Sequence, residues 1–331
     1  MINTIGFLPN STEIRQLNEF VPNESVKEHL EYLQIPILPR KDVDSSDKLS
    51  EERPVIKSTD SILFCTSNTE EISTVAFYGY DDTEIFVHHD MFVFSTIIDS
   101  CFIKNTLIGV ATFEPAIMIY DFMVDFPVLP QYLLIGHTGP VTGIKNKFEK
   151  LMSCSEDKMI IEWDINEMRL RSQKNHDVSI ERFDFEGNNL VFGSQKYLNI
   201  NNENISLDYD IEQLKIRDNL VFVSDCEGYI QIYDVRMPGK AMISQRLHES
   251  ALVDFCLAKD WIVTTSQDCT VKSWKTKELA LRYISEINTP GSQVLSLGYN
   301  EYNNLDEVFA GDENDNVFPI KLEENAQNEL D

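Results

Sequence analysis

YLLIGHTGPVTGIKNKFEKLMSCSEDKMIIEWDI, residues 132–165, is the most regular part of this chain. It opens with Gly136-His137, continues through three short segments of alternating apolar residues, and ends at Trp163-Asp164. Such alternation between turn signals is typical of short β-strands. The stretch therefore predicts one small antiparallel sheet, and weaker copies of it lie on both sides.

The copies recur at a long and nearly fixed period. An acidic residue stands six positions before an aromatic residue in four pairs, Glu114 and Tyr120, Asp157 and Trp163, Glu227 and Tyr233, and Asp268 and Trp274. Tyr120 lies 43 residues before Trp163, and Tyr233 lies 41 residues before Trp274. This is the period of WD40 repeats, in which about 40 to 45 residues form one four-stranded blade.

Three weaker copies complete the set. The 70 residues between Trp163 and Tyr233 leave room for a degraded copy around residues 197–205. Further copies fall at residues 61–90 and 292–321, where Ile320 takes the place of tryptophan. One blade cannot bury both of its faces alone, so blades stack around an axis. We therefore predict an all-β, seven-bladed WD40 β-propeller over residues 59–322.

The N-terminal part departs from the repeat. Residues 1–8 alternate as a strand, whereas residues 9–58 lose the β pattern and form an insertion. Val26, Leu30 and Leu33 have helical spacing, and a polar acidic linker follows, so we expect the insertion to be partly helical or disordered. The first strand either is the innermost strand of the blade at residues 61–90 or completes the last blade. Residues 323–331 form an acidic tail.

The formal net charge of −27 bears on the class of partner. It disfavours non-specific binding to nucleic acid or an anionic membrane, and it favours basic proteins. A local basic face formed by Lys145, Lys147, Lys150 and Lys158 leaves contact with RNA as an alternative to a plain solvated surface.

Cysteine usage and hydropathy indicate the compartment. The six cysteines lack CxxC or metal-finger spacing, and we expect them to be reduced. No charged leader with an apolar core opens the chain, and no run of 18 or more apolar residues occurs in it. We therefore expect a soluble intracellular protein.

Histidine, serine and aspartate, the three residue types of a nucleophilic triad, occur near one another in this chain, but the same combination occurs more than once. His89, His137, His176 and His248 each precede a blade, and a group that recurs is typical of a scaffold. We predict hydrogen-bonded networks that end on the tryptophan indole, in two sets: His137, Ser153, Asp157 and Trp163, and His248, Thr264, Asp268 and Trp274. Phosphate-loop, HExxH and nucleophile-elbow motifs are absent, so we expect no enzyme activity, no metal and no cofactor.

Candidate partner-binding residues lie between the strands. Propellers often bind through loops on a rigid scaffold, which makes His88, Asp90, Glu114 and Lys158 candidates, against the alternative that they only shape turns. The tetrapeptide Tyr233-Asp234-Val235-Arg236 is similar to the WDxR box with which some WD40 proteins dock onto a ubiquitin-ligase adaptor. A local pairing of Arg236 with a neighbouring carboxylate explains it equally.

Several segments resemble one WD40 family, the periodic tryptophan protein 1 family. These are the opening MINTIGFLP, the segment at residues 58–90 that ends in Val87-His88-His89-Asp90, and IGVATFEPAIMIYDFMV at residues 108–124. The chain departs from the family by having three tryptophans and a fourth blade without its serine and aspartate signals.

The resemblance implies a nuclear, mainly nucleolar protein that helps assemble the large ribosomal subunit, including rRNA processing, as a monomer within a larger complex. Basic ribosomal or assembly-factor proteins are then the expected partners, with pre-ribosomal RNA as a further one. Two alternatives stay open, a substrate receptor of a ubiquitin ligase and a chromatin protein that binds histones.

Overall fold

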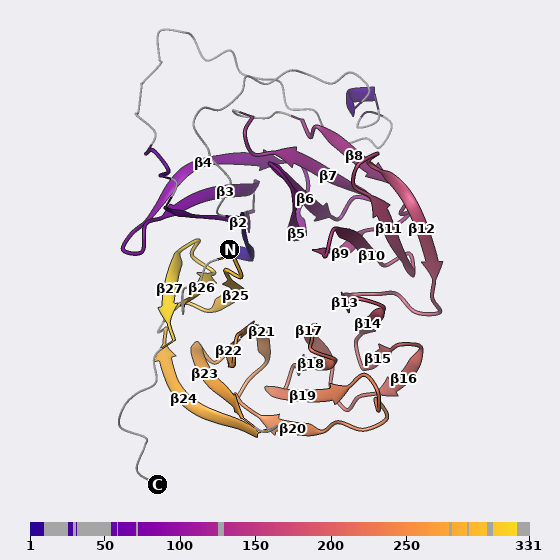
Figure 1. The fold of residues 1–331 in the computed structure, drawn as a ribbon, viewed down its shortest axis with the longest axis vertical. Helices are drawn as coiled ribbons and strands as arrows, with labels where there is room; N and C mark the ends of the chain where they lie inside the picture. The colour runs from indigo at the N-terminus through magenta and orange to yellow at the C-terminus, as the bar shows by residue number, and fades with distance from the viewer. Residues whose placement is uncertain are drawn as a thin grey trace.

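The structure is a computed structural model that describes residues 1–9, 26–28, 31, 54–57, 59–70, 72–124, 129–277, 280–289, 291–302 and 307–322. Its strands form seven antiparallel sheets arranged in a ring around one axis (Figure 1). The predicted all-β, seven-bladed propeller is confirmed. Helix is found among the described residues only at Val26–Glu28 and Glu31, inside the predicted helix; Leu30 and Leu33 lie outside the described residues.

The first four blades hold sixteen strands. They are β1 (Ile2–Phe7), β2 (Ser61–Asn68), β3 (Ser73–Tyr80) and β4 (Ile85–Val93); β5 (Ile97–Lys104), β6 (Leu107–Thr112), β7 (Ala116–Asp121) and β8 (Tyr132–Ile135); β9 (Val141–Lys147), β10 (Lys150–Ser155), β11 (Met159–Asp164) and β12 (Arg169–Asn175); and β13 (Arg182–Glu186), β14 (Asn189–Ser194), β15 (Tyr197–Ile200) and β16 (Glu203–Ser206).

The other three blades follow the same order, except that the described part of the last has three strands. They are β17 (Ile211–Arg217), β18 (Leu220–Asp225), β19 (Tyr229–Asp234) and β20 (Ile243–Arg246); β21 (Leu252–Ala258), β22 (Trp261–Ser266), β23 (Thr270–Lys277) and β24 (Ala280–Asn288); and β25 (Val294–Tyr299), β26 (Glu307–Asp312) and β27 (Val317–Lys321).

Burial follows the position of a strand in its blade. The second strands, such as β10 and β22, are buried almost throughout because neighbouring blades cover both of their faces. The outermost strand β12, with the sequence RLRSQKN, is exposed along its whole length. The hydrophobic core therefore lies between blades. One cluster, for example, joins Ile117 and Ile119 of the second blade to Ile144, Ile161 and Trp163 of the third.

The N-terminal strand β1 closes the ring at the junction between the first and last blades. β1 pairs with β2 as the innermost strand of the first blade, which is the first of the two arrangements considered above. Across the gap it lies against the last blade, where Gly298 and Gly311 leave room for Ile5 and Ile2. Phe7 packs edge-on against Phe309, with 5.3 Å between ring centroids.

Two described residues of the insertion are anchored on the propeller. Val26 and Ile56 are buried in one cluster with Leu8, Phe64 and Tyr120, at the junction of the first and second blades. The domain boundaries 9–58 and 323–331 stay predictions, because most of both segments lies outside the described residues.

Candidate functional site

The predicted network of the third blade is one continuous chain of hydrogen bonds. His137 Nδ1 lies 3.0 Å from Asp157 Oδ2, and His137 Nε2 lies 2.8 Å from Ser153 Oγ. Trp163 Nε1 donates to the same Ser153 oxygen at 2.8 Å. Ser153 therefore donates to the imidazole while it accepts from the indole, which uses both capacities of its hydroxyl.

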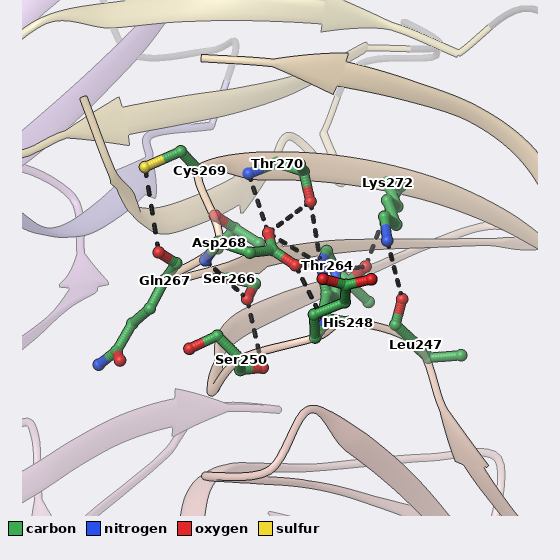
Figure 2. A network of polar contacts seen from close by, with 12 residues as sticks. Leu247, His248, Ser250, Thr264, Ser266, Gln267, Asp268, Cys269, Thr270 and Lys272 are labelled. Atoms are coloured by element: carbon green, nitrogen blue, oxygen red, sulfur yellow. Dashed lines mark hydrogen bonds and ion pairs between the residues drawn. The ribbon is translucent and has the colours of Figure 1, made fainter. Parts of the chain in front are cut away.

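The sixth blade repeats the arrangement with threonine in place of serine (Figure 2). His248 Nδ1 lies 3.1 Å from Asp268 Oδ2, and His248 Nε2 lies 2.8 Å from Thr264 Oγ1. Trp274 Nε1, outside this view, donates to Thr264 at 3.0 Å. Figure 2 shows Thr270 beside this network, and its hydroxyl donates to Asp268 at 2.6 Å. The structure thus brings together all eight residues of the two predicted networks.

Burial fixes the protonation of these groups. It lowers the pKa of His137 below its ordinary value, and the charge of Asp157 offsets this only in part. Burial also lowers the pKa of His248, and the charge of Asp268 offsets this only in part. Burial alone would raise the pKa of Asp157, but the N–H groups of Thr138 and Met159, together with His137, hold it below its ordinary value. Each network therefore consists of a neutral imidazole and a charged carboxylate.

These triads are scaffold parts and do not have the features of a nucleophile. Ser153 and Thr264 are fully buried, and each hydroxyl bonds an indole that would have to be released before attack. The same constellation occurs in two blades, as a repeated structural unit does. Across the residues that the structure covers, no group of three or more His, Cys, Asp or Glu side chains is arranged to hold a metal ion.

The other blades replace the network in different ways. In the fifth blade Leu207, Val223 and Tyr233 stand in the positions of histidine, serine and tryptophan, and Tyr233 donates to Gln231 instead. Replacing both polar partners by apolar ones avoids an unpaired buried group. Before the fourth blade, the His176 ring packs against Phe192 with centroids 4.3 Å apart and planes tilted by 58°. Its Nε2 has no hydrogen-bond partner in the described structure.

The prediction that His89 precedes a blade as a member of this set was wrong. His89 lies inside β4, stacks on Phe77, and bonds the Phe122 carbonyl through Nε2 at 2.9 Å. The position four residues before the next blade, which His137 and His248 occupy in theirs, is held by Val93. His89 instead joins the first blade to the second.

Three aspartates on the innermost strands clamp neighbouring blades together, and the sequence reasoning missed them. Asp99 accepts from Ile144 N at 3.0 Å and from Lys145 Nζ at 2.9 Å, both in the third blade. Burial alone would lower the pKa of Lys145, but Asp99 raises it above its ordinary value. This clamp fastens the second blade to the third.

The other two clamps reach a blade on each side. Asp184 accepts from Lys147 Nζ in the third blade and from Ile216 N in the fifth, at 2.7 and 2.9 Å. Asp254 accepts from Lys215 Nζ in the fifth blade and from Leu297 N in the seventh, at 3.1 and 2.9 Å. Together with Asp99, these carboxylates cross every junction from the second blade to the seventh. An aspartate at the third position of the innermost strand, directly after a hydrophobic residue in all three blades, was the available signal.

The clamps also correct the predicted basic face. Lys145 and Lys147 are held by Asp99 and Asp184, and Lys150 lies 3.4 Å from Glu162. Three of the four lysines are therefore neutralised by carboxylates, which weakens the case for an RNA contact there.

The candidate partner residues do not form one surface. Glu114 lies on the turn between β6 and β7, and Lys158 on the equivalent turn between β10 and β11. Arg236 follows β19 and so lies at the opposite end of its blade. His88 and Asp90 are within β4, not in a loop as expected.

Arg236 has a local partner. Its Nε donates to Asp234 Oδ1 at 2.8 Å, and the hydrogen bonds from this guanidinium lower the pKa of Asp234 to about 2. This is the local pairing that the sequence offered as the alternative to a ligase-docking box.

Comparison with known proteins agrees with this architecture. The sequence profile of the WD domain, G-beta repeat, matches residues 129–164, which hold the third blade's network. The fold is a WD40 propeller. No curated protein sequence matches the chain.

Solved structures resemble this WD40 propeller at low sequence identity. The WD40 domain of Toxoplasma gondii coronin is 13% identical with a TM-score of 0.67, over 82% of this chain and 80% of that one. The WD40 β-propeller domain of Doa1 is 20% identical with a TM-score of 0.66, over 79% and 90%. The computationally designed Ika8 protein is 18% identical with a TM-score of 0.58, over 79% and 80%. These likenesses show the fold alone.

Within the described residues, no helix is both long enough and apolar enough to cross a membrane. The six cysteines are free thiols, three of them buried.

Replacing Ser153 with alanine is expected to lower the free energy of unfolding by about 1–3 kcal/mol, because it leaves both a buried imidazole nitrogen and a buried indole N–H unpaired. Urea denaturation followed by tryptophan fluorescence measures the change. Ser224→Ala is the matched control, since the Ser224 hydroxyl is equally buried but has no partner among the described residues. Equal losses in the two variants would contradict the role given to Ser153.

Stability is expected to fall as the pH drops below about 6.5, the ordinary histidine value. Because burial lowers the pKa of His137 and His248 in the folded state, the unfolded chain binds protons first and unfolding is favoured. Above that value this contribution is fully present. Urea midpoints between pH 8 and 5.5 measure it, with the double variant His137→Gln and His248→Gln as control. A midpoint that rises on acidification in this range would be inconsistent with neutral, buried imidazoles.

Proposed function

We propose that this protein is a non-enzymatic WD40 scaffold in ribosome biogenesis, acting in assembly of large-subunit precursors and in rRNA processing. The observation that carries the scaffold part is that both histidine–serine/threonine–aspartate sets end on buried indoles. These residues, which have the composition of a catalytic triad, therefore stabilise the blades. We infer that the protein acts through the loops on the two faces of its rigid ring.

The family-like segments support the ribosomal part of the proposal. Residues 87–90 lie in the first blade and residues 108–124 in and after the second and third strands of the second blade. His89 bonds the Phe122 carbonyl, and Phe77 lies 5.5 Å from Phe122 between ring centroids. The segments that resemble the periodic tryptophan protein 1 family thus contact each other where the first blade meets the second. By this resemblance the protein acts in the nucleus, mainly in the nucleolus.

Charge supports the class of partner. A net charge of −27 suits basic ribosomal or assembly-factor proteins, and the pairing of Lys145, Lys147 and Lys150 makes a direct RNA contact at that face less favourable. We propose that pre-ribosomal RNA associates mainly through those proteins.

Affinity capture of the tagged protein from its own cells tests this proposal. We expect large-subunit precursor rRNA and basic assembly proteins in the captured material, compared with an untagged control. Capture of a ubiquitin-ligase adaptor that is lost in Arg236→Ala, or of histones without precursor rRNA, would replace the proposal with one of the two alternatives.

A further inference from the structure

Five carboxylates gather at the entry of the fifth blade, on the loop before β17, at the start of β17, at the end of β18 and on the turn that follows it. Asp208, Asp210 and Glu227 are exposed, Glu212 is half-buried and Asp225 is buried. Among the described residues none of these five forms an ion pair. Two guanidiniums lie beside these residues, and both donate to main-chain carbonyls. Arg182 donates to those of Glu181 and Glu212, and Arg246 donates to that of Glu227 at 3.1 Å.

In the third and sixth blades, the last residue of the second strand makes a set of hydrogen bonds that the fifth blade lacks. The residue opposite the start of the innermost strand is a serine, Ser155 or Ser266. Its hydroxyl donates to the carbonyl of the leading loop, Gly139 at 3.1 Å or Ser250 at 3.3 Å. It also accepts the N–H of the turn aspartate at 3.0 or 3.1 Å.

In the fifth blade Asp225 holds this position, opposite Ile211. Its Oδ1 accepts the N–H groups of Glu227 and Tyr229 at 3.0 and 2.9 Å. Its Oδ2 is buried and makes no hydrogen bond of normal geometry in the described part of the chain, although the Gln231 side chain lies close enough to lower the pKa of the carboxyl. The whole Asp225 residue is 2% exposed. Because Leu207 replaces the histidine of this blade, Glu227 also receives no imidazole donor.

The seventh blade provides an internal comparison. Asp312 holds the same position, opposite Val294, and its Oδ2 accepts from Ser292 at 2.8 Å and from Asn316 at 2.9 Å. Ser292 lies two residues before the innermost strand, and Tyr209 has that place in the fifth blade. The fifth blade therefore lacks the donor that the seventh supplies.

As a result, the pKa values of Asp225 and Asp312 are shifted in opposite directions. Burial raises the pKa of Asp225, against the N–H groups of Tyr229 and Glu227 and the side chain of Gln231. Burial would also raise the pKa of Asp312, but Asn316, Ser292 and the turn N–H groups hold it below its ordinary value.

Tyr229, whose main-chain N–H bonds Asp225 Oδ1, forms a pair with Tyr209. The rings of Tyr209 and Tyr229 stack with centroids 6.0 Å apart and planes 16° apart. The guanidinium of Arg246 lies 6.0 Å from the centre of the Tyr229 ring, so this pair already packs against one cation. Tyr209 is 39% exposed, and Asp208 and Asp210 flank it in the chain.

We propose that Tyr209, Tyr229 and the carboxylates around Asp225 bind an arginine side chain of a basic protein segment. A guanidinium stacks on an aromatic ring and carries several N–H donors for carboxylates at once, whereas an ammonium has no plane to stack. The inference rests on the proposed function for the class of partner, a basic protein, and adds the site and the side chain that it recognises.

Fluorescence anisotropy with a labelled octa-arginine peptide, and with octa-lysine for comparison, tests the site in the purified full-length protein at 150 mM salt. Asp225→Ser installs the residue of the third and sixth blades, and we expect it to fold normally while the octa-arginine affinity falls about fivefold or more. Tyr209→Ala is expected to weaken octa-arginine more than octa-lysine. Asp312→Ser removes one charge at the equivalent position of the seventh blade and should change the affinity by less than about twofold.

Equal effects of Asp225→Ser and Asp312→Ser would show that only overall charge attracts the peptide, and they would overturn the site. An unchanged affinity in Asp225→Ser, or equal binding of both peptides in the wild type and in Tyr209→Ala, would do the same. Because the assay contains no ribosomal component, its failure rejects this site and leaves the capture experiment as the separate test of function.

Discussion

Asp254→Ala is expected to lower the free energy of unfolding by about 3–5 kcal/mol, the usual cost of removing one partner of a buried ion pair. The change leaves Lys215 without its carboxylate and removes the acceptor of Phe255 N and Leu297 N. Since native domains are stable by only about 5–15 kcal/mol, a loss of this size removes a large part of the total. Urea denaturation followed by tryptophan fluorescence measures it.

Asp177→Ala is the control for this variant. Asp177 is an exposed aspartate in the loop before the fourth blade, and we expect its replacement to change stability by no more than about 0.5 kcal/mol. If Asp254→Ala loses less than about 1 kcal/mol, the clamp does not hold the fifth, sixth and seventh blades together as described.

Removing residues 1–8 is expected to abolish cooperative unfolding. The deletion takes away β1 and with it the buried side chains Ile2, Phe7 and Leu8, each of which contributes roughly 1.5–3 kcal/mol. It also opens the seam between the first and last blades. Calorimetry of the purified truncated protein should then show no sharp transition, whereas the full chain shows one.

A point variant tests the same seam without shortening the chain. A Cβ at Gly311 would lie 2.3 Å from Ile2 Cγ2, so Gly311→Val should force β1 away from the last blade and lower the melting temperature strongly. At Gly139 the nearest atom would be 3.4 Å away, an ordinary contact, and Gly139→Ala is the control. A cooperative transition at the wild-type temperature in Gly311→Val would contradict closure through β1.

The blade networks were predictable because they depend on spacing within one repeat. His137, Ser153, Asp157 and Trp163 fall inside 27 residues that form one blade and the loop before it, so register alone brings them together. The repeat period likewise placed Ile320 correctly opposite Val308, the tryptophan position of the last blade.

The clamps were not predictable because they depend on how blades stack. Asp184 meets Lys147 and Ile216, which come from two other blades, and no spacing within a repeat pairs them. The error at His89 has a related cause. His89 is near the boundary between two blades, but the repeat position of His137 and His248, four residues before the innermost strand, is held by Val93. Closure was undecided from sequence because the room for Ile2 and Ile5 comes from Gly311 and Gly298, about 300 residues away in the chain.

The sedimentation profile of large-subunit precursor RNA after depletion of this protein tests the central claim most directly. If the protein is a scaffold for large-subunit assembly, depletion should make unprocessed large-subunit precursor RNA accumulate and the mature large-subunit peak decline, and expression of the wild-type protein should restore both. An unchanged precursor profile after complete depletion would contradict the account.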